Sequence, residues 1–524
     1  MSEDVEPGQE SEAQLGESRV EHELSKCYPH CRGKPWYGGN KEALAWVLDA
    51  AGRSINYIAA GAFLATALLR LAKEAAGCET DPPEGETQVP ECDGRVHGIR
   101  PSSLLTTYTI VIGIASATLL PLMGSMVDYT PHRRLLGQIC AALFCIFMFP
   151  QIFIGENTWF MVAILQIVVG FIGWGHTLLA YAYLPELTSD DKLLNKYTSN
   201  FTVVQFGSMV VFLIVIVGIS FATGMSDDEV AVARLGMAIA FVLTSSCFVY
   251  AWKLFDKRPA TQQLPEGASI WTEGFKHIGR TSKLIYREFR SLGWFYVAVA
   301  TGDAAIQSLT TVLVTYFTDV MAFSSFENGI VILILLLASV PGAFLSGWFI
   351  NRYENAIWSS LISSCILVIN TFLASAILTG PGQQIRAYAV SALYGVGTGW
   401  KWSSDKLMSA TLIPGRHAAE MMGLYLFAGQ CLTWLPPLIF TGLNEAGLSQ
   451  RVNIAILNVY IFLSIIAYLR MGKYQDALEL AKSSKVEVRS ETDPDEQQYK
   501  TETFESANAI SSNDAEDSAP PSPL

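Results

Sequence analysis

The stretch Pro121-Leu-Met-Gly124-Ser-Met-Val-Asp128-Tyr-Thr-Pro131-His132-Arg133-Arg134 lies between two apolar runs. Its glycine predicts that two helices approach each other closely, and Asp128 falls at the expected end of a helix. Charges at this depth in a membrane are costly unless they are paired or lie at the interface. A basic turn that only fixes membrane orientation would explain Arg133 and Arg134, but it would not explain the spacing of Gly124 and Asp128.

The same spacing recurs half a chain later, in Gly347-Trp-Phe-Ile-Asn351-Arg352. Asn351 stands where the first copy has Asp128, so the repeat is degenerate. Degenerate repeats in corresponding halves are typical of two parallel bundles of membrane helices.

Composition supports a membrane protein. The 524 residues are 51% hydrophobic and only 16% charged, which is well below the usual quarter. We predict an all-α protein with twelve transmembrane helices in two six-helix bundles. The predicted helices are 44–71, 103–127, 135–154, 158–182, 199–223, 232–255, 292–318, 327–350, 356–379, 386–410, 421–443 and 452–470.

The predicted domains follow from these helices. Two acidic, polar segments at 1–42 and 472–524 are interpreted as disordered tails, and together they carry nearly all of the net charge of −13. The bundles occupy 43–255 and 291–471. Between them, residues 256–290 form a linker whose basic amphipathic stretch, 275–290, predicts a helix lying on the membrane surface.

Lysine and arginine in short loops predict the orientation. One set of loops is rich in these residues and is assigned to the cytoplasm, which also makes both tails cytoplasmic. The loop at 72–101 then carries three basic residues on the wrong side and is the weakest part of this assignment. The cytoplasmic set contains Arg133, Arg134, Lys192, Lys196, Arg352 and Arg416.

Cysteines suggest one covalent link and no metal site. Cys78 and Cys92 share a polar loop on the predicted non-cytoplasmic side, where either a disulfide or two free thiols fits the sequence. Cys27 and Cys31 flank His30, but no second ligand pair accompanies them.

Two further motifs narrow the family. Tyr181-Ala-Tyr-Leu-Pro185-Glu186-Leu187 ends the fourth predicted helix, and Gly395-Val-Gly397-Thr-Gly399-Trp-Lys-Trp402-Ser-Ser-Asp405-Lys406 lies in the tenth. The 121–134 stretch resembles the loop between helices 2 and 3 of major facilitator superfamily transporters. The chain over roughly 43–470 resembles the vacuole-effluxer, autophagy-related branch of that superfamily.

The resemblance implies efflux of amino acids from a vacuole or another endomembrane organelle. It also implies that Asp128 stabilises the N-terminus of helix 11 and holds a gate closed, with Asn351 as the weaker mirror contact. The implied gating residues are Gly124, Asp128, Arg133, Arg134, Gly347, Asn351 and Arg352. Trp402 and the run Asp405-Lys406-Leu407 depart from the family pattern. The substrate of the family therefore need not be the substrate of this chain.

Two pairs of opposite charges recur at a spacing of four within predicted helices. Asp49 and Arg53 share one helix face, and Lys401 and Asp405 share another. Each pair is either a structural ion pair or a polar group bordering a cavity. With Trp402, these four are candidate residues of a substrate or proton site.

Asp303 is the strongest candidate of that site. Val299 and Gln307 lie four residues to either side, so it has no opposite charge on its own face. Its position is close to the bilayer midplane, where such transporters bind solutes and ions. Because desolvation disfavours a charged carboxylate, Asp303 can carry a proton or meet an ammonium group. A partner from another helix, such as Arg53 or Lys401, would instead make it structural.

The sequence therefore predicts a secondary transporter for small solutes, with amino acids as the leading class and protons as a coupled ion. Its partners are the solute and the lipid bilayer; a nucleic-acid partner, a cofactor and an enzymatic activity are not expected, because phosphate-binding loops, basic patches and catalytic constellations are missing from the sequence. The alternative is a transporter-like receptor or scaffold that does not transport.

Overall fold

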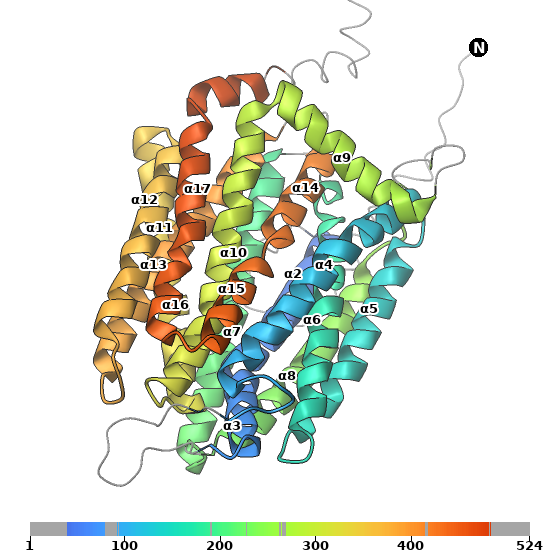
Figure 1. Cartoon of the computed structure of the whole chain (residues 1–524). Helices are drawn as coiled ribbons and strands as arrows, with labels where there is room; N and C mark the ends of the chain where they lie inside the picture. The colour runs from blue at the N-terminus through green and yellow to red at the C-terminus, as the bar shows by residue number, and fades with distance from the viewer. Residues whose placement is uncertain are drawn as a thin grey trace, which may run out of the picture.

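Two groups of helices lie side by side in the computed structural model (Figure 1). The structure describes residues 39–78, 92, 94–188, 191–226, 228–260, 264, 269–413, 418–481 and 483. The predicted tails and the Cys27–His30–Cys31 group fall largely outside this range.

The first bundle begins with one continuous rod, in which the π-helical segment η1 (Ala60–Leu64) joins α2 (Lys41–Ala59) to α3 (Ala65–Ala75). The Asn40 side chain accepts from two backbone N–H groups and caps the start of α2. The other helices of this bundle are α4 (Leu104–Tyr129), α5 (Arg133–Met148), α6 (Trp159–Tyr181), α7 (Asp191–Thr223) and α8 (Glu229–Leu254).

The second bundle follows the linker helix α9 (Ile270–Glu288). Its members are α10 (Arg290–Asp319), α11 (Ser325–Tyr353), α12 (Ala356–Ile377), α13 (Gln384–Leu412), α14 (Ala418–Cys431), α15 (Leu435–Glu445), α16 (Gln450–Ile456) and α17 (Asn458–Arg470). The predicted helix 421–443 is divided into α14 and α15, because Pro436 and Pro437 in the first turn of α15 lack the N–H groups that would continue the preceding helix.

Eleven helices of the described part are long and apolar enough to cross a membrane, judged by length and composition. The remaining predicted span, 386–410, is the 29-residue helix α13, and its charged residues explain why it is less apolar. It packs against α11 and α12, as Figure 1 also shows, so it completes the second six-helix bundle. The charged residues of α13 are Arg386, Lys401, Asp405 and Lys406.

The structure corrects two predicted boundaries. The first helix begins at Lys41, inside the segment assigned to the N-terminal tail. Residues 474–481 are helical, with Tyr474, Ala477 and Ala481 buried, so the disorder predicted from 472 begins too early. The amphipathic linker helix is present, and it starts five residues before the predicted 275.

The helices differ in how deeply they are buried. In an apolar 18-residue segment of the α2–α3 rod 83% of the residues are buried and in that of α10 67%, whereas in that of α7 only 22% are buried. The α2–α3 rod and α10 are therefore the central helices, and they are the first helix of each bundle. We call the end of the bundles where α9 lies the α9 end; α3 lies at the opposite end (Figure 1).

Candidate functional site

A polar stripe runs along α2 at intervals of four residues, which places its members on one helix face. Asp49 is fully buried, the Arg53 side chain is 13% exposed, and Tyr57 is 57% exposed. At Gly61 an added Cβ would meet no atom of the described residues within 4 Å. An exposed face on such a buried helix borders open space.

Tyrosines of both bundles lie near Tyr57. Tyr57 is within electrostatic range of Tyr108 on α4 and of Tyr394 on α13. Tyr108 belongs to the first bundle and Tyr394 to the second, so Tyr57 faces their interface.

Asp303 occupies the corresponding position on α10. Its side chain is 18% exposed, and Gln307, one turn further, is also partly exposed. Asp303 Oδ1 lies 4.0 Å from Lys401 Nζ and accepts no hydrogen bond from the described residues. Gly429 of α14 adjoins the other oxygen, since a Cβ there would lie 3.3 Å from Oδ2. The carboxylate is thus incompletely satisfied: Oδ1 is buried without a hydrogen bond from the described residues, and a cation from another helix lies at the limit of an ion pair.

Lys401 and Asp405 form a buried network within the second bundle. Lys401 Nζ donates to Asp405 Oδ2 and, over 3.1 Å, to the Tyr468 hydroxyl. Asp405 Oδ1 accepts from Tyr468 over 2.6 Å and from Ser360 over 3.0 Å. Lys401 is 0% and Asp405 2% exposed. These contacts favour the structural interpretation of this pair.

Asp49 is held in a similar network within the first bundle. Its carboxylate accepts from Arg53 Nε over 2.7 Å and from Trp252 Nε1 over 3.0 Å, and His176 Nε2 also contacts it. Arg53 Nη1 donates to Thr177 over 3.0 Å, whereas Nη2 has no hydrogen-bond partner among the described residues. Asp49 therefore orients Arg53 and leaves one guanidinium nitrogen unused.

Two further tyrosines connect these networks across the interface. Tyr181 lies within electrostatic range of Arg53, and Tyr425 lies within range of both Asp303 and Tyr181. Tyr181 of the first bundle and Tyr425 of the second thus lie between Arg53 and Asp303 in this chain of interactions, and Arg53 and Asp303 form no direct ion pair among the described residues.

The sequence had not singled out these tyrosines. Tyr57 could have been found from the sequence, because it lies four residues after Arg53 and therefore on the same helix face. Tyr181 stood in a quoted motif without an assigned role. Tyr425 and Tyr468 belong to other helices, and no spacing links them to Asp303 or Asp405.

Trp402 lies beside this site and contacts the other bundle. Its ring stacks on Phe206 of α7, with centroids 6.2 Å apart. Lys406, one turn further along α13, donates to Thr202 of α7 over 3.1 Å. Two of the residues that depart from the family pattern, Trp402 and Lys406, thus lie where α13 meets α7.

Arg133 has a defined partner in the motif that ends helix α6. Its Nη1 donates to Glu186 Oε1 over 2.9 Å and to the Ala182 carbonyl over 3.1 Å. The guanidinium also lies 5.4 Å from the centroid of the Tyr183 ring. Burial raises the pKa of Tyr183 to about 12, so its hydroxyl remains a donor, and it bonds the Asp256 carbonyl over 3.2 Å. These contacts hold the α9 end of the first bundle together.

The other predicted gating residues make fewer contacts. An added Cβ at Gly124 or Gly347 would meet no described atom within 4 Å, so the close helix approach predicted at Gly124 is not found among the described residues. Asn351 and Arg352 are exposed, and Arg352 lies over the Tyr353 ring. The side chain of Asp128 is outside the described part of the structure. Arg134 donates to the Lys253 carbonyl over 3.0 Å.

The two bundles meet through polar contacts at the end opposite α9. Lys73 of α3 and Asp319 of α10 form an ion pair of 2.7 Å, with side chains only 7% and 10% exposed. Nearby, Thr106 and Thr441 hydrogen bond over 2.7 Å, and Asn444 donates to Ser102 over 2.7 Å. The sequence did not predict these pairs, because their members are hundreds of residues apart.

Cys78 and Cys92 lie at this same end and are joined by a disulfide, one of the two alternatives that the sequence left open. The bond ties the end of α3 to the segment that carries Arg95 and Arg100. Arg95 pairs with Glu445 of α15 over 2.8 Å, and the Arg100 backbone N–H donates to the same carboxylate over 2.9 Å. The segment that follows Cys92 therefore takes part in the contact between the bundles.

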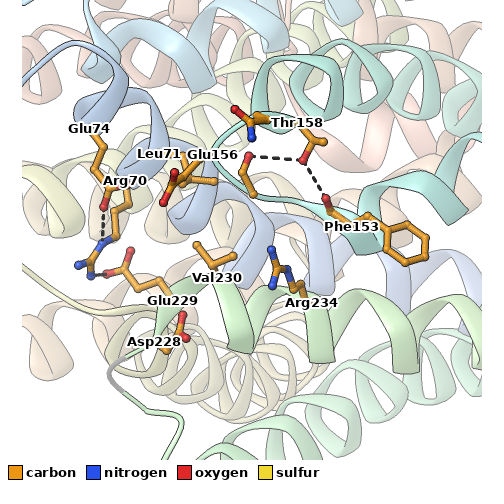
Figure 2. Close-up of a pocket in the computed structure, with 12 residues that line it drawn as sticks. Arg70, Leu71, Glu74, Phe153, Glu156, Thr158, Asp228, Glu229, Val230 and Arg234 are labelled. Carbon is orange, nitrogen blue, oxygen red and sulfur yellow. Dashed lines mark hydrogen bonds and ion pairs between the residues drawn. The ribbon is translucent and has the colours of Figure 1, made fainter.

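A pocket of about 640 Å³ opens at this end as well (Figure 2). Figure 2 shows Arg70 between Glu74 and Glu229. The Arg70 guanidinium forms ion pairs of 3.2 Å with Glu74 and 3.8 Å with Glu229. All lining residues belong to the first bundle, and neither Arg53 nor Asp303 is among them. The lining residues are Arg70, Leu71, Glu74, Phe153, Gly155, Glu156, Asn157, Thr158, Asp228, Glu229, Val230 and Arg234.

Comparison with solved structures agrees with this architecture. A POT family transporter in complex with 5-aminolevulinic acid has a TM-score of 0.58 at 12% identity, covering 84% of this chain and 98% of that chain. A mutant of the nucleoside transporter NupG gives 0.57 at 14%, with coverage of 83% and 100%. A D-xylose-proton symporter gives 0.54 at 13%, with coverage of 82% and 97%. At such identities the likeness establishes the fold, which is that of the major facilitator superfamily.

Sequence comparison identifies the family. The chain is 20% identical over 362 residues to the uncharacterized MFS-type transporter YxiO of Bacillus subtilis (strain 168), covering 68% of this chain and 82% of that protein. The sequence model described as "Vacuole effluxer Atg22 like" matches residues 38–479. These relatives are transporters rather than enzymes. The chain therefore belongs to the Atg22-like vacuole effluxer family, a branch of the major facilitator superfamily of secondary transporters.

Proposed function

We propose that this transporter carries amino acids out of a vacuole or a related endomembrane organelle, coupled to protons, with both termini in the cytoplasm. The proposal is supported by Arg53 and Asp303, which lie on the central helices of different bundles. Within the described part of the chain, Arg53 Nη2 and Asp303 Oδ1 have no hydrogen-bond partner. A zwitterion has a carboxylate for the first and an ammonium group for the second.

The geometry is also compatible with movement of the two bundles about this site. Arg53 and Asp303 belong to different bundles, so a bound zwitterion would make contacts that depend on how the bundles approach each other. 5-Aminolevulinic acid, the ligand of the structurally similar POT family transporter, also carries an amine and a carboxylate. Transporters of this fold can bind their solutes at the midplane between the two halves.

The test is uptake of a labelled amino-acid mixture into proteoliposomes of the purified protein, with and without an inward acidic gradient. We expect uptake that the gradient accelerates. Uptake that ignores the gradient would reject proton coupling. If well-folded protein took up nucleosides or sugars but no amino acid, amino acids would be rejected as the substrate class.

A prediction for the end opposite α9 follows from the Lys73–Asp319 pair. We expect Lys73→Met to open this end more often, because removing one member of a buried pair leaves Asp319 uncompensated. A cysteine introduced as Tyr57→Cys should then react with a membrane-impermeant maleimide, added from that side, about tenfold faster than the same cysteine in protein that keeps Lys73. Protein that retains Tyr57 gives the background labelling of the native cysteines.

Lys73→Arg is the matched control, because it keeps the charge opposite Asp319 and should leave labelling slow. If Lys73→Met and Lys73→Arg gave the same rate, the ion pair would have no part in closing this end.

A further inference from the structure

The exposed side of α9 carries two adjacent stripes. Lys276, Arg280, Lys283 and Arg287 recur at intervals of four, three and four residues and share one face at ~100° per residue. All four are exposed, and neither Lys276, Lys283 nor Arg287 has an ion-pair partner among the described residues. Arg280 contacts the buried Glu273.

The second stripe is aromatic and lies next to the basic one. Trp271, Phe275 and Tyr286 are 69%, 49% and 76% exposed. Aromatic rings beside cations on one helix are typical of the boundary between lipid and water. The remaining face is buried, and it includes Gly274 and Thr281.

That buried face fixes α9 on α4. A Cβ at Gly274 would collide with the carbonyl oxygen of Pro121, so only glycine permits this approach. Ser125 of α4 donates to the Ile270 carbonyl over 2.9 Å. The stripes are therefore held at a fixed position at the α9 end, against the helix that carries Gly124 and Asp128 (Figure 1).

We propose that this face of α9 binds the headgroups of anionic lipids in the membrane that the bundles cross. The aromatic stripe reaches the lipid boundary, and the basic stripe neutralises the headgroup phosphates and carboxylates. Two observations select this occupant over an acidic protein segment. Exposed rings require a partly apolar surface. α9 packs on α4 and α10, two helices apolar enough to cross a membrane, which carry exposed apolar side chains such as Leu119 and Val297.

The test is fluorescence quenching of the full chain in bilayers containing either brominated phosphatidylserine or brominated phosphatidylcholine. The contribution of Trp271 is the difference between the protein and its Trp271→Phe variant. We expect stronger quenching of Trp271 by the brominated anionic lipid. Neutralising Lys276→Gln, Lys283→Gln and Arg287→Gln together should lower the relative affinity for it about tenfold or more, since each cation near an anionic surface contributes several-fold.

The control removes the same charge elsewhere, with Lys253→Gln, Arg386→Gln and Lys473→Gln, and should retain the preference. Added salt should weaken the preference in the unsubstituted protein. Equal quenching by the two lipids, or an unchanged preference in the α9 variant, overturns the proposal. A preference that emerges only after deletion of residues 484–524 also overturns it, because the acidic tail would then be the occupant.

Discussion

Asp303→Asn is expected to lower gradient-driven uptake at least tenfold while the protein remains folded. Asparagine keeps the size of the side chain but removes the charge that would meet an ammonium group and the site that would carry a proton. A hydrogen bond to a charged group is worth about 2 kcal/mol, which corresponds to more than tenfold in binding. The measurement is initial uptake by proteoliposomes at several pH values.

Folding is separated from function by the melting temperature of the purified variant. Asp303 Oδ1 has no hydrogen-bond partner among the described residues, and its nearest cation is 4.0 Å away. Stability should therefore change little. Asp303→Glu is the matched variant, and it should keep part of the pH dependence. If Asp303→Asn transported normally with an unchanged pH profile, the site would lie elsewhere.

The fold could be predicted because each membrane helix is recognisable from its own run of apolar residues. A degenerate repeat of one loop then indicated the two bundles. The apolar run is least clear in α13, because charged residues interrupt it. This helix is stabilised instead by packing against α11 and α12. The helix at 474–481 was not predicted, because its apolar face is short and an acidic segment follows it directly.

The candidate site could be predicted only in part, and the reason is distance along the chain. Asp49–Arg53 and Lys401–Asp405 are pairs within one helix, so a spacing of four reveals them. Contacts between helices leave no such pattern. The approach of His176 to Asp49 and of Lys73 to Asp319 depends on how whole helices pack, and a single sequence does not specify that packing.

Lys401→Met is expected to destabilise the protein more than any other change considered. It would leave Asp405 buried without its cation, and breaking such a pair costs about 3–5 kcal/mol. For a chain of this size we expect the melting temperature to fall by roughly 5 °C or more. The measurement is thermal unfolding in detergent, compared with the unsubstituted protein.

The double variant Lys401→Met with Asp405→Asn separates charge from packing. Asparagine can still accept the hydrogen bonds that Tyr468 and Ser360 now donate to Asp405, but it carries no uncompensated charge. We therefore expect the double variant to be more stable than Lys401→Met alone, with a coupling of about 1–3 kcal/mol in the double-mutant cycle. Its transport should still respond to Asp303, because that carboxylate shares no hydrogen bond with Asp405 or Tyr468 among the described residues. If the two substitutions were additive, Lys401 would instead stabilise the protein mainly through Asp303, and this carboxylate would be part of the structural network rather than a site for solute or proton.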